Sequence, residues 1–209
     1  MNVQYGCGKC APDNWVNFDV SPNLRLEKLP VIGSLFVRKE WGAYPKNVKY
    51  GDIIKSLPGI KNESCEAIYC SHVLEHLTYF NMQIALKNTY QMLKKGGIFR
   101  LVVPDMEVYV NAYLDGKRSG NKSACHHLII NTLMSPEKGP KTIKDKIITL
   151  FGNSKHQWNY DYESMYLELE KVGFKNIRRA ILNDSKNQAF KDVEDKGRFD
   201  YSLAIECIK

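Results

Sequence analysis

The strongest constraint on the fold is an alternation of short strand-like runs with longer segments through the first half of the chain. The strand-like runs are rich in β-branched and aromatic residues and are bounded by Gly, Asp and Pro, which is typical of buried strands. They are Val3–Tyr5, Trp15–Asp19, Val48–Tyr50, Glu66–Cys70 and Ile98–Val103. The sequence therefore predicts an α/β fold built on a parallel sheet.

One helix is predicted between the last two of these strands. Apolar residues recur there at helical spacing, at Met82, Leu86, Tyr90 and Leu93. We expect Lys94 and Lys95 in its last turn, where cations complement the helix dipole, and Gly96-Gly97 at its end. A strand, a helix and a strand in succession require a right-handed parallel crossover.

The strand signals stop after the fifth run and return near residue 174. Helices are expected at Met106–Leu114, Ser123–Met134 and Ile143–Phe151. We predict that residues 105–155 form an α-helical insertion that covers the substrate. A helix capped by Asp161 follows, and strands are expected at Phe174–Leu182 and Tyr201–Ile208. The polar stretch between these strands, residues 183–198, is expected to be a mobile loop.

The composition limits the class of protein. The chain has 209 residues, 44% hydrophobic and 25% charged, which fits one globular domain over residues 1–209 and excludes a disordered chain. Lys and Arg number 30 and Asp and Glu 23, a moderate surplus that does not single out nucleic acid. No apolar run reaches the roughly 18 residues of a membrane span, and the N-terminus is unlike a signal peptide. We expect a cytoplasmic protein whose oligomeric state the sequence does not indicate.

Six cysteines are expected to be free thiols in a reducing compartment. Two other interpretations stay open. Cys7 and Cys10, together with Cys65 and Cys70, have a loose version of the spacing of a four-cysteine zinc site. Cys7 and Cys10 alone have the spacing of a thioredoxin-like redox pair.

Small and polar residues follow each strand of the predicted sheet, at the edge where parallel α/β sheets bind ligands. They are Gly6-Cys7-Gly8, Asp19, Gly51-Asp52, Ser71-His72 and Pro104-Asp105. Glycines after the first strand let the backbone approach a ligand closely, although a tight turn needs them too. Asp19 can accept hydrogen bonds from both hydroxyls of a ribose, and Asp52 can accept one from an adenine amino group.

Five segments in order make the chain resemble the class I S-adenosylmethionine-dependent methyltransferases. They are VQYGCGKCAPDNWVNFDVSP, GDIIKSLP, AIYCSHVLEHL, MLKKGGIFRLVVPD and HQWNYDYESMYLELEKVGF, within residues 3–174. The resemblance implies a Rossmann-like, doubly wound sheet of seven strands in the order 3-2-1-4-5-7-6, with the last strand antiparallel. It also implies S-adenosylmethionine as the cofactor.

The resemblance assigns roles to residues at the strand ends. Gly6, Cys7 and Gly8 match the loop under the methionine part of the cofactor. Asp19 matches the acid that holds the ribose. Asp52 and Ile53 match the adenine contacts, and Ser71 and His72 match the residues beside the sulfonium.

The chain departs from this family between the first two strands. Only residues 9–14 separate Gly8 from Trp15, which leaves room for about one helical turn in place of a full helix. We expect Asn23–Glu40 to replace that helix in space. A dinucleotide-binding Rossmann motif fits less well, because Ala11 stands where a third glycine is needed and Asp19 follows too closely.

His72-x-x-Glu75-His76 is the most unusual local motif. On a helix these three side chains would share one face and serve acid–base chemistry or bind a divalent metal. The motif resembles the E-x-x-E-H motif of two metal-using branches of the superfamily, with His72 in place of a glutamate. His156 resembles a later histidine that joins the metal in the RNA-modifying branch. Without a metal, His72 or His156 is the candidate general base.

Other aromatic and histidine residues carry weaker signals. His126 and His127 are neighbours on a predicted helix, about 100° apart, so they are not expected to enter one site. Trp158, Tyr160 and Tyr162 are expected either to line a substrate cleft or to belong to the core.

The sequence thus predicts a methyltransferase that O-methylates a small polar acceptor bearing a sugar or phosphate. An RNA or protein acceptor is the alternative, with nucleic acid possible but not favoured, and a metal site at His72, Glu75, His76 and His156 is possible in either case. A non-catalytic binding module on the same fold is the alternative from another class.

Overall fold

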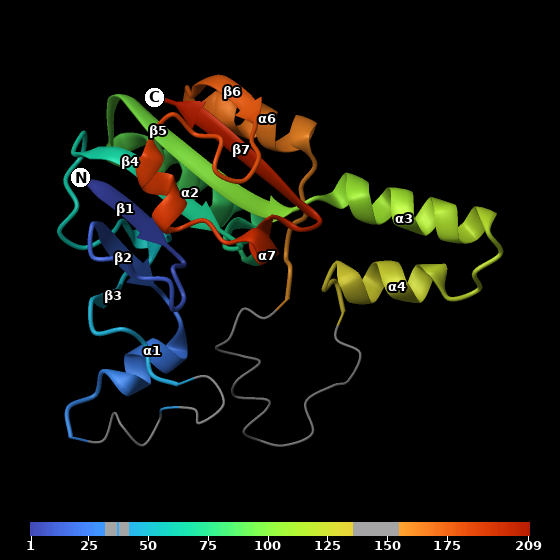
Figure 1. The fold of residues 1–209 in the computed structure, drawn as a ribbon, viewed down its shortest axis with the longest axis horizontal. Coiled ribbons are helices and arrows are strands. Elements are labelled where there is room, and N and C mark those ends of the chain that lie inside the picture. Colours follow the sequence, from blue (N-terminus) through green and yellow to red (C-terminus); the bar gives the residue numbers. More distant parts are fainter. Residues whose placement is uncertain (32–36, 38–41, 136–154) are drawn as a thin grey trace.

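The computed structural model describes residues 1–31, 37, 42–135 and 155–209. Seven strands form its sheet: β1 (Asn2–Tyr5), β2 (Trp15–Asp19), β3 (Val48–Tyr50), β4 (Cys65–Ser71), β5 (Leu93–Pro104), β6 (Lys175–Arg179) and β7 (Ser202–Ile208). Their order is β3-β2-β1-β4-β5-β7-β6 (Figure 1). Strands β1 to β5 pair in parallel, and β7 pairs antiparallel with both β5 and β6. The predicted fold class and strand order are confirmed.

Helices α2 (Tyr79–Met92) and α6 (Tyr162–Val172) cover one face of the sheet. Met82 and Leu86 of α2 and Met165 and Leu169 of α6 are fully buried, in one core with the inward side chains of the central strands. The helix predicted at 82–93 and the Asp161 cap are therefore found. Asp161 accepts a hydrogen bond from the Ser164 N–H at 2.8 Å and forms a capping box with that residue.

The predicted end of the first helix is wrong by one turn. Helix α2 ends at Met92, and Lys94 and Lys95 already belong to β5. Backbone partners explain the early change to extended structure. The Gly96 N–H donates to the Lys209 carbonyl at 2.9 Å, and the Lys209 N–H donates to the Gly97 carbonyl at 3.0 Å.

The opposite face of the sheet is covered by residues 183–199, where a mobile loop was predicted. This segment contains η4 (Gln188–Asp192), a 3₁₀ helix, and the short helix α7 (Lys196–Phe199). Phe190 is fully buried, with its ring 5.6 Å from that of Trp15 and 6.3 Å from that of Tyr69. The prediction of a mobile loop is wrong because two apolar side chains, Phe190 and Val193, anchor an otherwise polar stretch.

The same segment takes the place of the helix that is missing between β1 and β2. The Trp15 indole N–H donates to the Ala189 carbonyl at 3.2 Å, and the Asn14 side chain donates to Asp192 at 2.7 Å. The expected replacement, Asn23–Glu40, provides α1 (Pro22–Glu27), whose Leu24 packs on Cys7 and Val48 instead. Residues 32–36 and 38–41 of that stretch lie outside the described residues.

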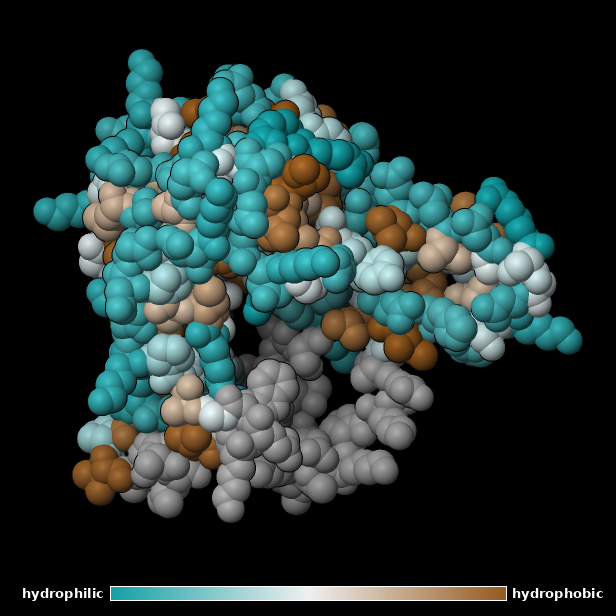
Figure 2. Space-filling model, viewed as in Figure 1, coloured by the Kyte–Doolittle hydropathy of each residue, from teal (hydrophilic) through white to brown (hydrophobic). Residues whose placement is uncertain are grey.

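Helices α3 (Met106–Arg118) and α4 (Ala124–Asn131) follow β5 and extend away from the sheet as an antiparallel pair, the α3–α4 hairpin (Figure 1). No residue of α3 is buried, and a Cβ on Gly116 would lie 3.0 Å from the Ala124 Cβ. Apolar side chains gather on the hairpin in Figure 2. Leu114 of α3 is 40% exposed and Ile130 of α4 is 39% exposed. Leu133 and Met134, which follow α4, are 44% and 45% exposed.

The third helix predicted in the insertion, 143–151, lies outside the described residues. Among the helices that are described, none has the length and apolar character needed to cross a bilayer.

Candidate functional site

A cavity of about 520 Å³ lies at the carboxyl ends of β1 to β4. Six of the predicted site residues line it: Gly6, Gly8, Asp19, Asp52, Ile53 and His72. Cys7 and Ser71 do not line it. They are buried beside it, Cys7 against Leu24 and Val48. Arg198 and His76 also line it, and sequence reasoning assigned neither of them to the cofactor site.

The loop after β1 runs close to the segment after β4. Gly6 has φ +68°, and a Cβ at this position would stand 2.0 Å from Cγ2 of Val73. Gly8 has φ +55°, and a Cβ at this position would be 3.7 Å from a guanidinium nitrogen of Arg198, an ordinary contact distance. The positive φ favours glycine at both positions, and at Gly6 a side chain would also clash with Val73.

Asp19 braces this loop. One carboxylate oxygen accepts a hydrogen bond from the Gly8 N–H at 2.9 Å, and the other accepts one from the Ser21 N–H at 2.7 Å. Each oxygen keeps a second lone pair for a ligand in the cavity. Asp52 is arranged similarly, accepting a hydrogen bond from the Ile54 N–H at 3.0 Å while it lines the cavity.

His72 uses both of its ring nitrogens. Nε2 donates to the Arg198 carbonyl at 2.9 Å, and Nδ1 lies 3.3 Å from Oε1 of Glu75. Burial acts to lower the pKa of His72, but the Glu75 carboxylate and the Arg198 carbonyl outweigh it and raise the pKa. Two acceptors around one ring favour the imidazolium, so His72 offers no free nitrogen to take a proton in this arrangement.

The H-x-x-E-H motif was expected to lie on one face of a helix, and this expectation is wrong. His72 has φ +53°, and residues 74–76 form the 3₁₀ turn η3 (Leu74–His76). The α-helix begins only at Tyr79, where Thr78 accepts a hydrogen bond from the Asn81 N–H as its N-cap. The left-handed residue at the end of β4 turns the chain before a helix can start.

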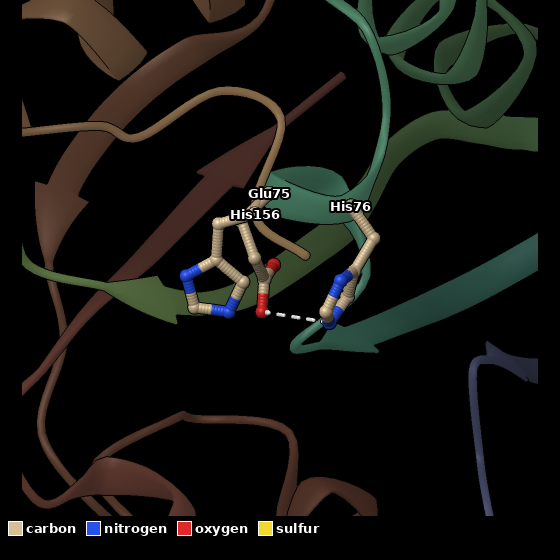
Figure 3. Close-up of side chains that lie close together, drawn as sticks. All are labelled: Glu75, His76 and His156. Atoms are coloured by element: carbon tan, nitrogen blue, oxygen red, sulfur yellow. Dashed lines mark ion pairs between the residues drawn. The ribbon is translucent and has the colours of Figure 1, made fainter. Parts of the chain in front are cut away.

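The turn nevertheless brings Glu75 and His76 together, and residues 155–158 add His156 (Figure 3). The Gln157 N–H donates to the Glu75 carbonyl at 2.7 Å, and the Gln157 side chain donates to the His76 carbonyl at 2.8 Å. The His76 and His156 rings lie 5.0 Å apart, edge to face. One ligand atom from each of the three residues lies within 4.8 Å of the others, and His72 is not part of this group.

Glu75 is the least satisfied group of this cluster. It is fully buried, and neither carboxylate oxygen has a hydrogen-bond donor of good geometry among the described residues. The nearest candidates are His72 Nδ1 at 3.3 Å and His76 Nε2 at 3.8 Å. A buried carboxylate in this state is costly unless a positive charge stands beside it.

The pKa of His156 shifts in the opposite direction to that of His72. Burial lowers the pKa of His156, against the attraction of the Glu75 carboxylate. Its Nδ1 is buried, and the part of the chain that the structure describes offers it no hydrogen-bond partner. His156 therefore holds a nitrogen that can accept a proton or bind a metal.

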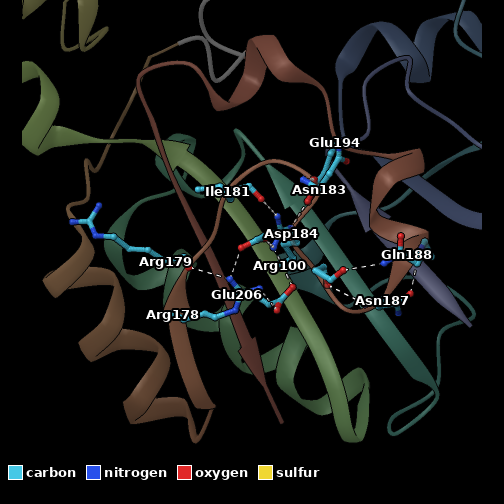
Figure 4. Close-up of polar contacts among 12 residues, drawn as sticks. Arg100, Arg178, Arg179, Ile181, Asn183, Asp184, Asn187, Gln188, Glu194 and Glu206 are labelled. Carbon is cyan, nitrogen blue, oxygen red and sulfur yellow. Dashed lines mark hydrogen bonds and ion pairs between the residues drawn. The ribbon is translucent and has the colours of Figure 1, made fainter.

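Arg100 forms polar contacts with the segment that precedes Arg198 in the chain (Figure 4). Arg100 is fully buried in β5 and forms ion pairs with Asp184, Glu194 and Glu206. It also donates to the Ile181 carbonyl at 2.6 Å. We call these residues the Arg100 cluster. It ties the start and the end of residues 181–194 to the sheet.

The remaining predicted candidates lie elsewhere. His126 and His127 are exposed on α4, and Tyr160 is buried in the core. Trp158 is 46% exposed and packs on Tyr79, with ring centres 5.0 Å apart, while Tyr162 is half-buried at the edge of the core.

The cysteines form no zinc site. All six are free, and the only grouping of potential metal ligands in the described parts of the chain is that of Glu75, His76 and His156. Burial, with Asp19 nearby, raises the pKa of Cys7 to about 12, which also makes it unsuited to a redox pair with Cys10.

Comparison with known proteins identifies the fold. Residues 34–101 match the family model described as a methyltransferase domain. A SAM-dependent methyltransferase from Archaeoglobus fulgidus superposes over 100% of this chain and 85% of its own, at 14% identity and a TM-score of 0.51. A SAM-dependent methyltransferase from Thermotoga maritima, described as a possible histamine N-methyltransferase, matches over 100% and 82% at 18% identity, with a TM-score of 0.50. No curated protein matches the sequence. The fold is that of SAM-dependent methyltransferases, and the family match supports the predicted enzyme class and cofactor.

Proposed function

We propose that this chain is a methyltransferase that binds S-adenosylmethionine in the cavity at the ends of β1 to β4 and methylates a hydroxyl group of a small polar acceptor. The observation that carries the proposal is the lining of that cavity. Asp19 and Asp52 face it with spare acceptor lone pairs, beside the glycine loop that follows β1. This is the chemistry that a ribose and an adenine require, so the residues present fit the cofactor.

The cofactor supplies an electrophilic methyl group on a sulfonium. The chain has two further tasks, which are to hold the acceptor in line and to accept its proton. His72, Val73, His76 and Leu77 form one wall of the cavity, and His76 also belongs to the group with Glu75 and His156. The acceptor hydroxyl is expected at this wall.

His156 is the better of the two predicted bases. It is the histidine with a lowered pKa and an unpartnered Nδ1. His72 is better suited to a positioning role, because its ring joins the end of β4 to the Arg198 backbone. A His156→Gln variant is then expected to lose about 100- to 10,000-fold in kcat with little change in cofactor affinity.

A metal-assisted reaction at the same wall is the second candidate, and the buried carboxylate of Glu75 favours it. Glu75, His76 and His156 would hold the ion, without the predicted His72. One oxygen and two nitrogen donors suit Zn²⁺ or another first-row transition metal better than Mg²⁺. Such an ion would polarise the acceptor hydroxyl. If turnover is unchanged after complete removal of metal, the metal-assisted reaction is excluded and the metal-free general base remains.

The acceptor is expected to contact the α3–α4 hairpin, within the predicted insertion at 105–155. A small molecule is favoured over RNA or a protein side chain, because the charge surplus is moderate and spread along the chain. The six free thiols fit the predicted cytoplasmic location.

Titration calorimetry with S-adenosylhomocysteine tests the proposal. We expect saturable binding that Asp19→Ala weakens at least about tenfold, followed by methyl transfer in a screen of hydroxylated acceptors. Binding without transfer to any acceptor class would favour the non-catalytic module. Absence of binding by the folded wild-type chain would refute the proposed function.

A further inference from the structure

The proposed cofactor site contains one arginine beside two carboxylates. The carboxylates that line the cavity are those of Asp19 and Asp52, and the single lysine or arginine among the lining residues of the described chain is Arg198. Two carboxylates repel a carboxylate group of a ligand, and a fixed cation near that group offsets the repulsion. The methionine part of the proposed cofactor carries such a carboxylate.

The position of Arg198 fits that part of the ligand. Its guanidinium donates to the Ser71 carbonyl at 3.2 Å, at the end of β4. Another guanidinium nitrogen lies 3.7 Å from where a Cβ on Gly8 would stand, next to the loop after β1. Asp52 follows β3, which is three strands away from β4 in the sheet. Three strand spacings are about 14 Å, so Arg198 and Asp52 mark the two ends of an elongated ligand.

The guanidinium has donors to spare. Within the described chain, Arg198 has no carboxylate oxygen within 4.0 Å, whereas Arg100, Arg178 and Arg179 are all in ion pairs. One of its five N–H groups is used by Ser71. The others can form the two parallel hydrogen bonds by which arginine binds a carboxylate.

Arg198 is also held in place. Its carbonyl accepts a hydrogen bond from Nε2 of His72 at 2.9 Å, and the segment before it is fixed by the Arg100 cluster and by buried Phe190. A cation on a fixed backbone loses little conformational freedom when a ligand binds.

We propose that Arg198 binds the α-carboxylate of the methionine part of the cofactor. The proposal rests on the function proposed above and deepens it. It assigns this subsite to a residue of the segment between β6 and β7, far in sequence from the glycine loop.

Calorimetry with two ligands tests the assignment. S-adenosylhomocysteine carries the carboxylate, and 5′-methylthioadenosine has the same nucleoside without the amino acid. We expect Arg198→Gln to weaken S-adenosylhomocysteine binding by about 10- to 100-fold, the usual cost of losing hydrogen bonds to a charged group. Binding of 5′-methylthioadenosine should change by less than about twofold. Arg198→Lys should recover part of the lost affinity, because lysine restores the positive charge but not the two parallel hydrogen bonds of a guanidinium.

Lys196→Gln is the matched control. Lys196 is exposed on the same short helix and undergoes the same change of charge, so neither ligand should lose affinity. Equal losses for both ligands in Arg198→Gln would show that the residue only supports the loop, and unchanged binding of both would show that it is not used. Either result overturns the assignment. If the wild-type chain binds neither ligand, the proposed function itself is refuted.

Discussion

Replacement of Arg100 by methionine tests whether the segment over the second face of the sheet is held by buried charge. The Arg100 side chain has no exposed surface, and three carboxylates, those of Asp184, Glu194 and Glu206, pair with it. The Glu194 side chain has no exposed surface either. Methionine fills a similar volume but leaves this excess of negative charge without its central cation.

Breaking a buried ion pair from one side costs about 3–5 kcal/mol, because the remaining charge stays buried and uncompensated. For a chain of this size, 1 kcal/mol corresponds to about 2–4 °C in Tm, so a fall of about 6–20 °C is expected. Thermal and urea unfolding measure the global change. Hydrogen exchange should show the largest loss of protection in residues 183–199.

Lys94→Met is the control, because Lys94 forms an exposed pair with Glu66 and should cost less than about 1 kcal/mol. Adding Glu194→Gln to Arg100→Met should restore part of the lost stability, since it removes one of the stranded charges. A loss below about 1 kcal/mol in Arg100→Met, with unchanged exchange in 183–199, would refute the role given to the Arg100 cluster.

Three further predictions concern the same architecture. Phe190→Ala should cost about 3–5 kcal/mol in urea unfolding, whereas Phe80→Ala, at a side chain 68% exposed, should cost about 0.5 kcal/mol or less; equal costs would contradict the packing described. Gly6→Ala should weaken S-adenosylhomocysteine binding by at least about tenfold, and Val73→Ala in the same chain should recover part of it, because the added Cβ meets Val73. Burial acts to raise the pKa of Asp184, but its two arginine partners outweigh it and lower the pKa. Its contribution to stability is therefore present above about pH 5 and is lost as the pH falls below about 4, and Asp184→Asn should flatten the acid limb of a stability–pH curve.

The sheet was predictable because its signals are local. The central strands β4 and β5 contain short apolar runs, and several polar residues that line the cavity stand at strand ends, where topology brings them together. Asp19 and Asp52 belong to this class. Lys94 and Lys95 show the limit of such reasoning. Helical spacing and charge favoured a longer helix, but residues 93–97 extend β5 instead, because Gly96 and Gly97 form backbone hydrogen bonds with Lys209.

What the sequence did not predict depends on contacts between distant residues. His72 and Arg198 are 126 positions apart, and no local sequence pattern predicts the hydrogen bond between them. In residues 183–198 the apolar side chains are too few to produce a periodic signal, although Phe190 and Val193 anchor the segment. The geometry of the His72–His76 motif was missed for a different reason, because helical spacing was assumed where a left-handed residue forces a tight turn.

The burial of Trp15 by residues 189 and 190 has a consequence for folding during synthesis. Trp15 leaves the ribosome 174 residues before Ala189, which accepts the hydrogen bond of its indole N–H, and before Phe190, which packs on its ring. Until then, the first strands present an uncovered aromatic surface. Chains shortened before residue 190 should accordingly engage chaperones and aggregate, even though every residue proposed to hold the nucleoside has already been made.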